Sequence, residues 1–162
     1  MPVTLEAGDA APAFSLPDQD GVTHRLADYG GRMVVLYFYP KDETPGCTKQ
    51  ACSLRDHELA IQARGAVVLG VSTDSAESHR KFRAAHSLGF PLLVDDGAQV
   101  ATAYGAWGEK VLYGRTFIGM TRATFVIGTD GMLLKVWKRA RAEGHGEAVL
   151  AALGDISRKV GR

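Results

Sequence analysis

The segment MVVLYFYPKDETPGCTKQAC, residues 33–52, decides the fold and contains both cysteines of the 162-residue chain. Its first seven residues are apolar or aromatic without alternation, as expected of a strand that is covered on both faces. Pro40 ends this strand. Thr44 suits the N-cap of a following helix, and Pro45 suits its first position, where a missing N–H costs nothing. The segment therefore predicts a buried strand, a short loop and a helix.

Cys47 falls in the first turn of this predicted helix. The backbone N–H groups of a first turn lack helical acceptors, and the helix dipole places partial positive charge there. Both effects stabilise a thiolate, which is the reactive form of cysteine. Two ordinary buried cysteines are the alternative interpretation, but the Thr-Pro-Gly-Cys context favours a reactive one. Cys47 is therefore the candidate nucleophile.

Cys52 follows five residues later, on another face of the helix. Five residues rotate the second side chain by about 140° and separate the two Cα atoms by roughly 8 to 9 Å. A disulfide needs a Cα separation below about 7 Å. If these cysteines pair, the first turns of the helix must unwind, and catalysis includes local unfolding.

The remaining chain predicts further strands and helices around this unit. Asp20-Gly21 marks an N-terminal hairpin, and Asp74 with Glu77 resembles a capping box for a helix with Phe82 and Ala85 on its inner side. The other expected elements are a strand over 65–72, a helix over 75–87, a short strand over 90–94, a short helix near 97–103, a loop over 104–108, a hairpin over 123–137 and a helix over 144–159.

A strand-helix-strand unit followed by a hairpin and a last helix is typical of one fold class. We expect an α/β protein with a thioredoxin-like fold, in which a mixed central β-sheet carries helices on both faces. The length of 162 residues and the 46% hydrophobic content suit a single domain over residues 4–160. Function in such sheets lies beyond the carboxyl ends of strands, where Cys47 follows residues 33–39.

Composition excludes several function classes. The net charge is +1, so we expect no nucleic-acid partner and no membrane surface. The N-terminal residues lack the pattern of a signal peptide, and a close cysteine pair is typical of redox chemistry in the cytoplasm. No nucleotide-binding motif is present, and the five histidines are expected to be surface or partly buried residues. We therefore predict no cofactor and no metal.

Together these residues resemble the peroxiredoxins, and specifically the bacterioferritin comigratory protein or peroxiredoxin Q group. Pro40, Thr44 and Cys47 match the Pro-x-x-x-Thr-x-x-Cys phrase of that family's active site. The resemblance covers almost the whole chain, including residues 8–14, 55–56, 104–108 and 122–127. It implies a thioredoxin-dependent peroxidase that reduces hydrogen peroxide and alkyl hydroperoxides, and members of the group are often monomers.

The resemblance also implies residue roles. Cys47 would be the peroxidatic cysteine, and Cys52 would resolve its sulfenic acid as an intramolecular disulfide that a thioredoxin-type protein reduces. Thr44 would bind the peroxide and Arg122 would stabilise thiolate and peroxide. Pro40 would shield the thiol, and the backbone N–H groups of Gly46 and Cys47 would complete the cradle. Gln50 stands where the group more often has glutamate.

Two other functions remain open from the residues alone. A protein thiol-disulfide oxidoreductase would share the fold, although its usual cysteine spacing is C-x-x-C. A redox-switched interaction protein would instead expose apolar surface on oxidation. The role of Thr44 is open as well, because a hydroxyl that caps the helix cannot freely orient a peroxide.

Overall fold

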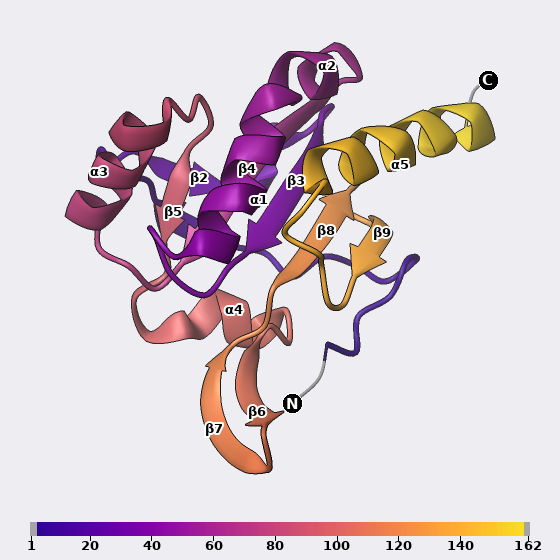
Figure 1. The fold of residues 1–162 in the computed structure, drawn as a ribbon. Coiled ribbons are helices and arrows are strands. Elements are labelled where there is room, and N and C mark those ends of the chain that lie inside the picture. Colours follow the sequence, from indigo (N-terminus) through magenta and orange to yellow (C-terminus); the bar gives the residue numbers. More distant parts are fainter. Residues whose placement is uncertain (1–2, 161–162) are drawn as a thin grey trace.

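A five-stranded mixed sheet forms the centre of the computed structural model, which describes residues 3–160 (Figure 1). Its strand order is β5-β4-β3-β8-β9. Strands β3, β4 and β5 run parallel, whereas β8 pairs antiparallel with both β3 and β9. The strands are β3 (Met33–Phe38), β4 (Ala66–Ser72), β5 (Leu92–Val94), β8 (Ala123–Ile127) and β9 (Leu133–Trp137).

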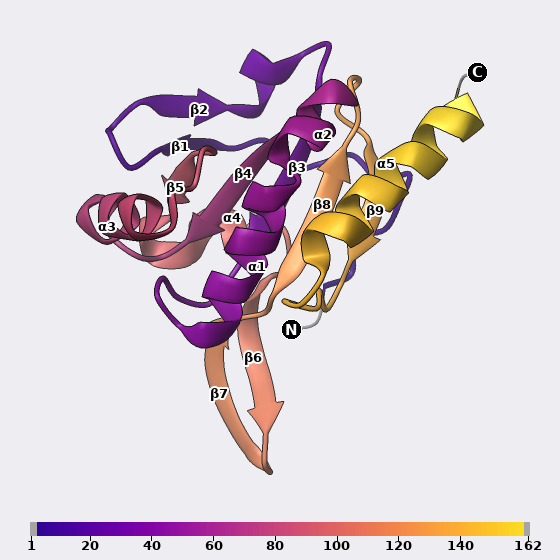
Figure 2. The same ribbon diagram turned by 45° about the horizontal axis from the view of Figure 1, so that its top comes forward.

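Helices cover both faces of this sheet (Figure 2). One face packs against α1 (Pro45–Asp56), α2 (Glu58–Ala63), α3 (Ala76–His86) and α5 (His145–Val160). The other face packs against α4 (Gln99–Ala103) and the N-terminal ribbon formed by β1 (Ser15–Pro17) and β2 (Thr23–Arg25). Side chains of β3 alternate between the two cores, with Leu36 and Phe38 in one and Tyr37 in the other. The predicted thioredoxin-like architecture is confirmed.

The smaller elements complete the chain. Strands β1 (Ser15–Pro17) and β2 (Thr23–Arg25) form the expected N-terminal hairpin, followed by a 3₁₀ turn, η1 (Leu26–Tyr29). A second 3₁₀ turn, η2 (Asp96–Ala98), precedes α4. No helix within the described residues is long and apolar enough to cross a membrane.

Part of the predicted loop over 104–108 is wrong, because Trp107 and Gly108 begin a strand. Strand β6 (Trp107–Leu112) pairs with β7 (Arg115–Met120) in a two-stranded ribbon that projects away from the sheet (Figure 1). A two-residue turn, Tyr113-Gly114, joins them with positive φ at both residues. Such a turn matches the twist of the flanking strands.

Helix α3 also differs in detail from the prediction. Its N-cap is Ser75 rather than Asp74, since the Ser75 Oγ accepts the backbone N–H of Ser78 at 3.1 Å. Ala85 is exposed, and His79 takes the inner position together with Phe82. The imidazole replaces an apolar side chain there because it has polar partners in the core, described below.

Candidate active site

The site begins where β3 ends and α1 starts. Thr44 occupies the N-cap position and Pro45 the first helical position, as predicted, so that Cys47 lies in the first turn. The Cys47 side chain is buried, with 1% of its surface exposed. Gly46 and Cys47 thus present first-turn backbone N–H groups, which have no acceptor within the helix.

Thr44 does not cap the helix with its side chain. Its hydroxyl instead donates a hydrogen bond to the carbonyl oxygen of Lys41 at 2.8 Å. The proton of this hydroxyl is therefore engaged, and the lone pairs of its oxygen remain free to accept a hydrogen bond. Pro40, for which the family resemblance implies a shielding role, is exposed.

Arg122 reaches the thiol from the segment between β7 and β8. Its Nη2 donates to the Cys47 Sγ at 3.5 Å, and its Nη1 donates to the Gln50 Oε1 at 2.6 Å. A Cβ at Gly46 would lie 3.0 Å from the Arg122 Nη2, so glycine leaves the guanidinium room to approach. The structure therefore brings Arg122, Gly46 and Cys47 together.

Two buried polar atoms under α1 have no hydrogen-bond partner among the described residues. They are the Nε2 of Gln50 and the hydroxyl of Tyr37. Burial of Tyr37, with the Cys47 thiol nearby, raises the pKa of its phenol well above the ordinary value of 10.0. Tyr37 is therefore a neutral hydroxyl at physiological pH.

Cys52 lies on the same intact helix and is half-buried. Both cysteines are free thiols. Arg55, three residues later on the same helical face, donates from its Nη1 to the carbonyl oxygen of His86 at 2.7 Å, so this face points toward α3. Cys52 thus lies on the α3 side of α1 and Gln50 on the Arg122 side.

The expectation that all histidines are surface or partly buried is wrong for His79 and His145, which are 0% and 2% exposed. The Nε2 of His145 lies 2.9 Å from the Thr124 Oγ1, and its ring packs edge-on against Trp137. Burial, with the Arg122 guanidinium nearby, lowers the pKa of His145 to about 4. His145 is therefore a neutral residue beside the site.

Sequence reasoning also missed the surroundings of Asp42, which is 5% exposed. Its carboxylate accepts hydrogen bonds from Tyr39, Ser78 and His79. Ligand atoms of Asp42, Asp74 and His79 lie within 4.8 Å of one another, but all three side chains are engaged in hydrogen bonds. Asp42 and His79 both stand among polar and charged residues in the sequence, so no local signal marks this cluster.

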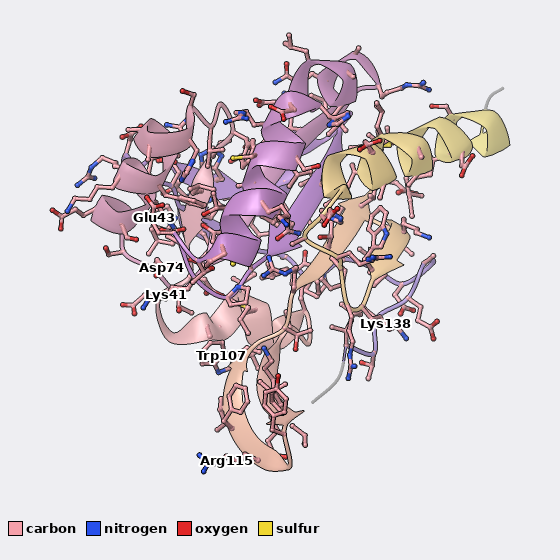
Figure 3. All side chains as sticks on the ribbon, in the orientation of Figure 1. Lys41, Glu43, Asp74, Trp107, Arg115 and Lys138 are labelled. Carbon is pink, nitrogen blue, oxygen red and sulfur yellow. The ribbon has the colours of Figure 1, made fainter. Side chains whose placement is uncertain are left out.

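A cleft opens on the outer side of Arg122, between the β6–β7 ribbon and the segment after β9. Cationic and apolar side chains share its walls, including Lys110, Val111, Leu112, Lys138 and Arg139. Lys138 and Trp107 are labelled on opposite sides of this region in Figure 3. Tyr113, at the tip of the ribbon, is 96% exposed and contributes to no core.

Comparisons with known proteins agree with this geometry. The AhpC/TSA family model matches residues 7–136. Peroxiredoxin Bcp of Bacillus subtilis (strain 168) is 43% identical over 157 residues, which cover 97% of this chain and 100% of the relative. Peroxiredoxin Bcp of Escherichia coli (strain K12) is 46% identical over 146 residues, 90% of this chain and 94% of the relative.

Solved structures give the same answer. The structure of Xanthomonas campestris bacterioferritin comigratory protein superimposes with a TM-score of 0.84 at 35% sequence identity, covering 89% of this chain and 92% of that one. Sequence and structure thus agree on one group of thiol peroxidases. The chain belongs to the AhpC/TSA family and is a peroxiredoxin of the Bcp, or peroxiredoxin Q, group.

Proposed function

We propose that Cys47 is the peroxidatic cysteine of this thiol peroxidase. Its thiolate attacks the terminal oxygen of a peroxide, an S–O bond forms as the O–O bond breaks, and the leaving oxygen takes a proton from solvent to depart as water or an alcohol. Cys47 becomes a sulfenic acid. The 3.5 Å hydrogen bond from the Arg122 Nη2 to the Cys47 Sγ is the observation that carries this assignment.

Arg122, Thr44 and the first-turn N–H groups supply the electrostatics of this step. Breaking the O–O bond moves negative charge onto the leaving oxygen, and a preorganised guanidinium beside it lowers the barrier. The Thr44 oxygen accepts a hydrogen bond from the peroxide hydroxyl, since its own proton is directed to the Lys41 carbonyl oxygen. Gly46 provides a backbone donor, and Pro40 limits access of water when substrate is bound.

Cys52 then resolves the sulfenic acid. Its thiol condenses with the Cys47 sulfenic acid, so that an S–S bond forms and water leaves. The two residues sit five positions apart on an intact α1, which must unwind before the sulfur atoms can meet. A thioredoxin-type dithiol reduces the disulfide and restores the helix.

The substrates proposed are hydrogen peroxide and alkyl hydroperoxides. The open cleft beside Arg122 has apolar walls at Val111 and Leu112 that suit an organic substituent. The neighbour from Xanthomonas campestris is described by its alkyl peroxide reduction activity, which supports the same class here. We propose that residues 4–160 act as one domain, as a monomer in the cytoplasm, without a cofactor.

The experiment is a comparison of Cys47→Ser and Cys52→Ser variants with the wild type. We expect the pre-reduced wild type to react with hydrogen peroxide orders of magnitude faster than free cysteine, because a more reactive thiolate alone brings only a modest gain. Cys47→Ser should remove this reaction. Cys52→Ser should keep the first oxidation and lose turnover with thioredoxin.

A wild-type rate like that of free cysteine would contradict the assignment of the site. Faster reduction of insulin disulfides than of peroxide would favour a protein oxidoreductase, although the 1% exposure of Cys47 disfavours attack on a bulky disulfide. Apolar dye binding that rises on oxidation, without turnover, would favour an interaction switch.

A further inference from the structure

A buried polar cluster attaches the loop over residues 40–44, which joins β3 to α1, to helix α3. The Asp42 Oδ1 accepts the Tyr39 hydroxyl at 2.6 Å, and its Oδ2 accepts the Ser78 hydroxyl at 2.8 Å and the His79 Nδ1 at 2.7 Å. Ser78 and His79 belong to α3, so the loop is attached to a helix more than thirty residues away in sequence.

The contacts of His79 fix its ring on two sides. Its Nδ1 lies 2.7 Å from the Asp42 Oδ2, and its Nε2 lies 2.9 Å from the carbonyl oxygen of Leu93. His79 and Asp42 thus form a buried pair, with both side chains at most 1% exposed. The geometry of such a pair is strongly fixed, because loss of either side chain would leave the other buried without this hydrogen-bond partner.

The backbone of the loop is attached a second time, at the end of β4. The Asp42 N–H donates to the Asp74 Oδ2 at 2.8 Å, and the Ser72 hydroxyl donates to the same oxygen at 2.7 Å. Figure 3 shows Lys41, Glu43 and Asp74 gathered beside the start of α1, on the side of α3. Residue 42 is therefore fixed through its side chain and its backbone.

The attachment of Asp42 affects its neighbour Lys41, which orients the Thr44 hydroxyl. Lys41 precedes Asp42, and its carbonyl oxygen accepts the Thr44 hydroxyl at 2.8 Å. A shift of residue 42 moves that carbonyl and releases the Thr44 proton. The cluster therefore controls the direction of the Thr44 lone pairs more directly than the position of the Cys47 thiol.

We propose that the buried Asp42–His79 pair is a positioning device for peroxide activation, which holds the Lys41 carbonyl against the Thr44 hydroxyl. The inference rests on the proposed role of the Thr44 oxygen as acceptor of a hydrogen bond from the peroxide hydroxyl. A positioning role predicts that loss of Asp42 slows reaction with peroxide, which needs an oriented Thr44. Alkylation of Cys47 needs only an accessible thiolate and should continue.

The experiment measures two second-order rate constants for the pre-reduced protein, one with hydrogen peroxide and one with iodoacetamide. In the Asp42→Ala variant we expect the peroxide rate constant to fall by about 10- to 100-fold, the range that small misplacements of reacting groups cause. The iodoacetamide rate constant should stay within about twofold of the wild-type value, since alkylation does not depend on a hydrogen bond from a peroxide hydroxyl to Thr44.

A matched control uses another Asp–His pair among the described residues. The Asp18 Oδ2 lies 2.8 Å from the His24 Nε2, and the Asp18 Oδ1 accepts the backbone N–H groups of Asp20 and Val22, all between residues 18 and 24. Asp18→Ala removes the same kind of interaction and should leave both rate constants unchanged. Equal slowing of the peroxide reaction in Asp18→Ala and Asp42→Ala would overturn the proposal, because a general loss of stability would then explain both.

The Thr44→Val variant separates this inference from the proposed function. If Asp42 acts through Thr44, the double variant Asp42→Ala/Thr44→Val is no slower with peroxide than Thr44→Val alone. Fully multiplicative losses would overturn the inference. A Thr44→Val variant as fast as wild type would instead overturn the proposed role of Thr44, and the inference with it.

Asp74→Ala provides the test should Asp42→Ala fail to fold. Asp74 lies in a half-buried loop and contributes one acceptor to the Asp42 backbone. Loss of a single hydrogen bond predicts a fall of about three- to tenfold in the peroxide rate constant, again without a change in alkylation. Equal falls in both reactions, or in neither, would contradict the proposal.

Discussion

Replacement of Arg122 by glutamine should slow the reaction with peroxide strongly. At 3.5 Å and an effective dielectric constant of about 20, the guanidinium and a thiolate attract each other by about 5 kcal/mol before any cost is subtracted. Desolvation and ordering leave a net value of about 1.5–3 kcal/mol for a hydrogen bond to a charged group. With about 1.4 kcal/mol per factor of ten, kcat/KM should fall by about 10- to 150-fold.

Stopped-flow measurement of the first oxidation gives this number directly. Arg122→Lys should lose less of kcat/KM than Arg122→Gln, because lysine keeps the positive charge. It should still be slower than wild type, because an ammonium group lacks the planar fork that contacts Cys47 and Gln50 at once. Arg139→Gln is the matched control, since Arg139 is an exposed cation of the same cleft. A loss below about threefold in Arg122→Gln, or an equal loss in Arg139→Gln, would refute the argument from the contact with Cys47.

Two further predictions concern α5. The lowered pKa of His145 means that the unfolded chain binds an extra proton between pH 6.5 and 4, so this residue stabilises the fold above that window and loses its contribution as the pH falls. Urea titrations of wild type should show that the free energy of unfolding falls by roughly 2 kcal/mol through His145 between pH 7.5 and 5. The His145→Gln variant should lack this part of the pH dependence, and an identical pH dependence in both proteins would contradict the prediction. Gly146→Ala should cost about 2 kcal/mol, or roughly 4–8 °C in Tm, because its Cβ would overlap the Ser53 carbonyl group. Gly144→Ala is an unsuitable control because φ is positive there, whereas Ala151→Gly on the exposed face of α5 would test helix propensity alone and should cost only about 1 kcal/mol. A Gly146→Ala variant as stable as wild type would contradict the close approach of α1 and α5.

The parts of the fold that sequence predicted are those with strong local signals. The short uninterrupted apolar run of residues 33–39, ended by Pro40, predicts a covered strand, and Thr44-Pro45 predicts where α1 begins. The Gly128–Gly131 turn between two apolar runs likewise predicted the β8–β9 hairpin. In each case the residues that specify the element are neighbours in sequence.

The β6–β7 ribbon was missed because its signals are unusual. Its turn places Tyr113 at φ 54°, a conformation for which asparagine, aspartate or glycine is typical. Its apolar residues Val111 and Ile118 are 73% and 67% exposed, so no buried face imposes an alternating pattern. Gly114 alone could have indicated the turn.

The polar clusters were missed for a different reason. Asp42 and His79 are 37 residues apart, and Thr124 and His145 are 21 apart, so only the finished fold brings them together. The proposed catalytic residues Pro40, Thr44 and Cys47 could be named from the sequence because their spacing matches a family motif. The residues that position them have no such local motif, because burial of a histidine depends on the hydrogen-bond partners that the fold places beside it.

The contacts of α1 define how far it can unwind when Cys47 and Cys52 join. Beyond Cys52 the helix is attached on both sides, by the Ser53 Oγ, which accepts the Gly146 N–H at 2.8 Å, and by Arg55, which donates to the His86 carbonyl. Before Cys52 the helix is attached by the contacts of Gln50 and Cys47 with Arg122 and by the exposed ion pair of Lys49 with Glu143 at 3.7 Å. The proposed oxidation of Cys47 would disturb its 3.5 Å contact with Arg122 and so weaken this first half. If Cys47 and Cys52 act as proposed, the same hydrogen bonds that activate the thiol therefore hold the helix wound until the peroxide has reacted, and the second half remains docked while the first half rewinds.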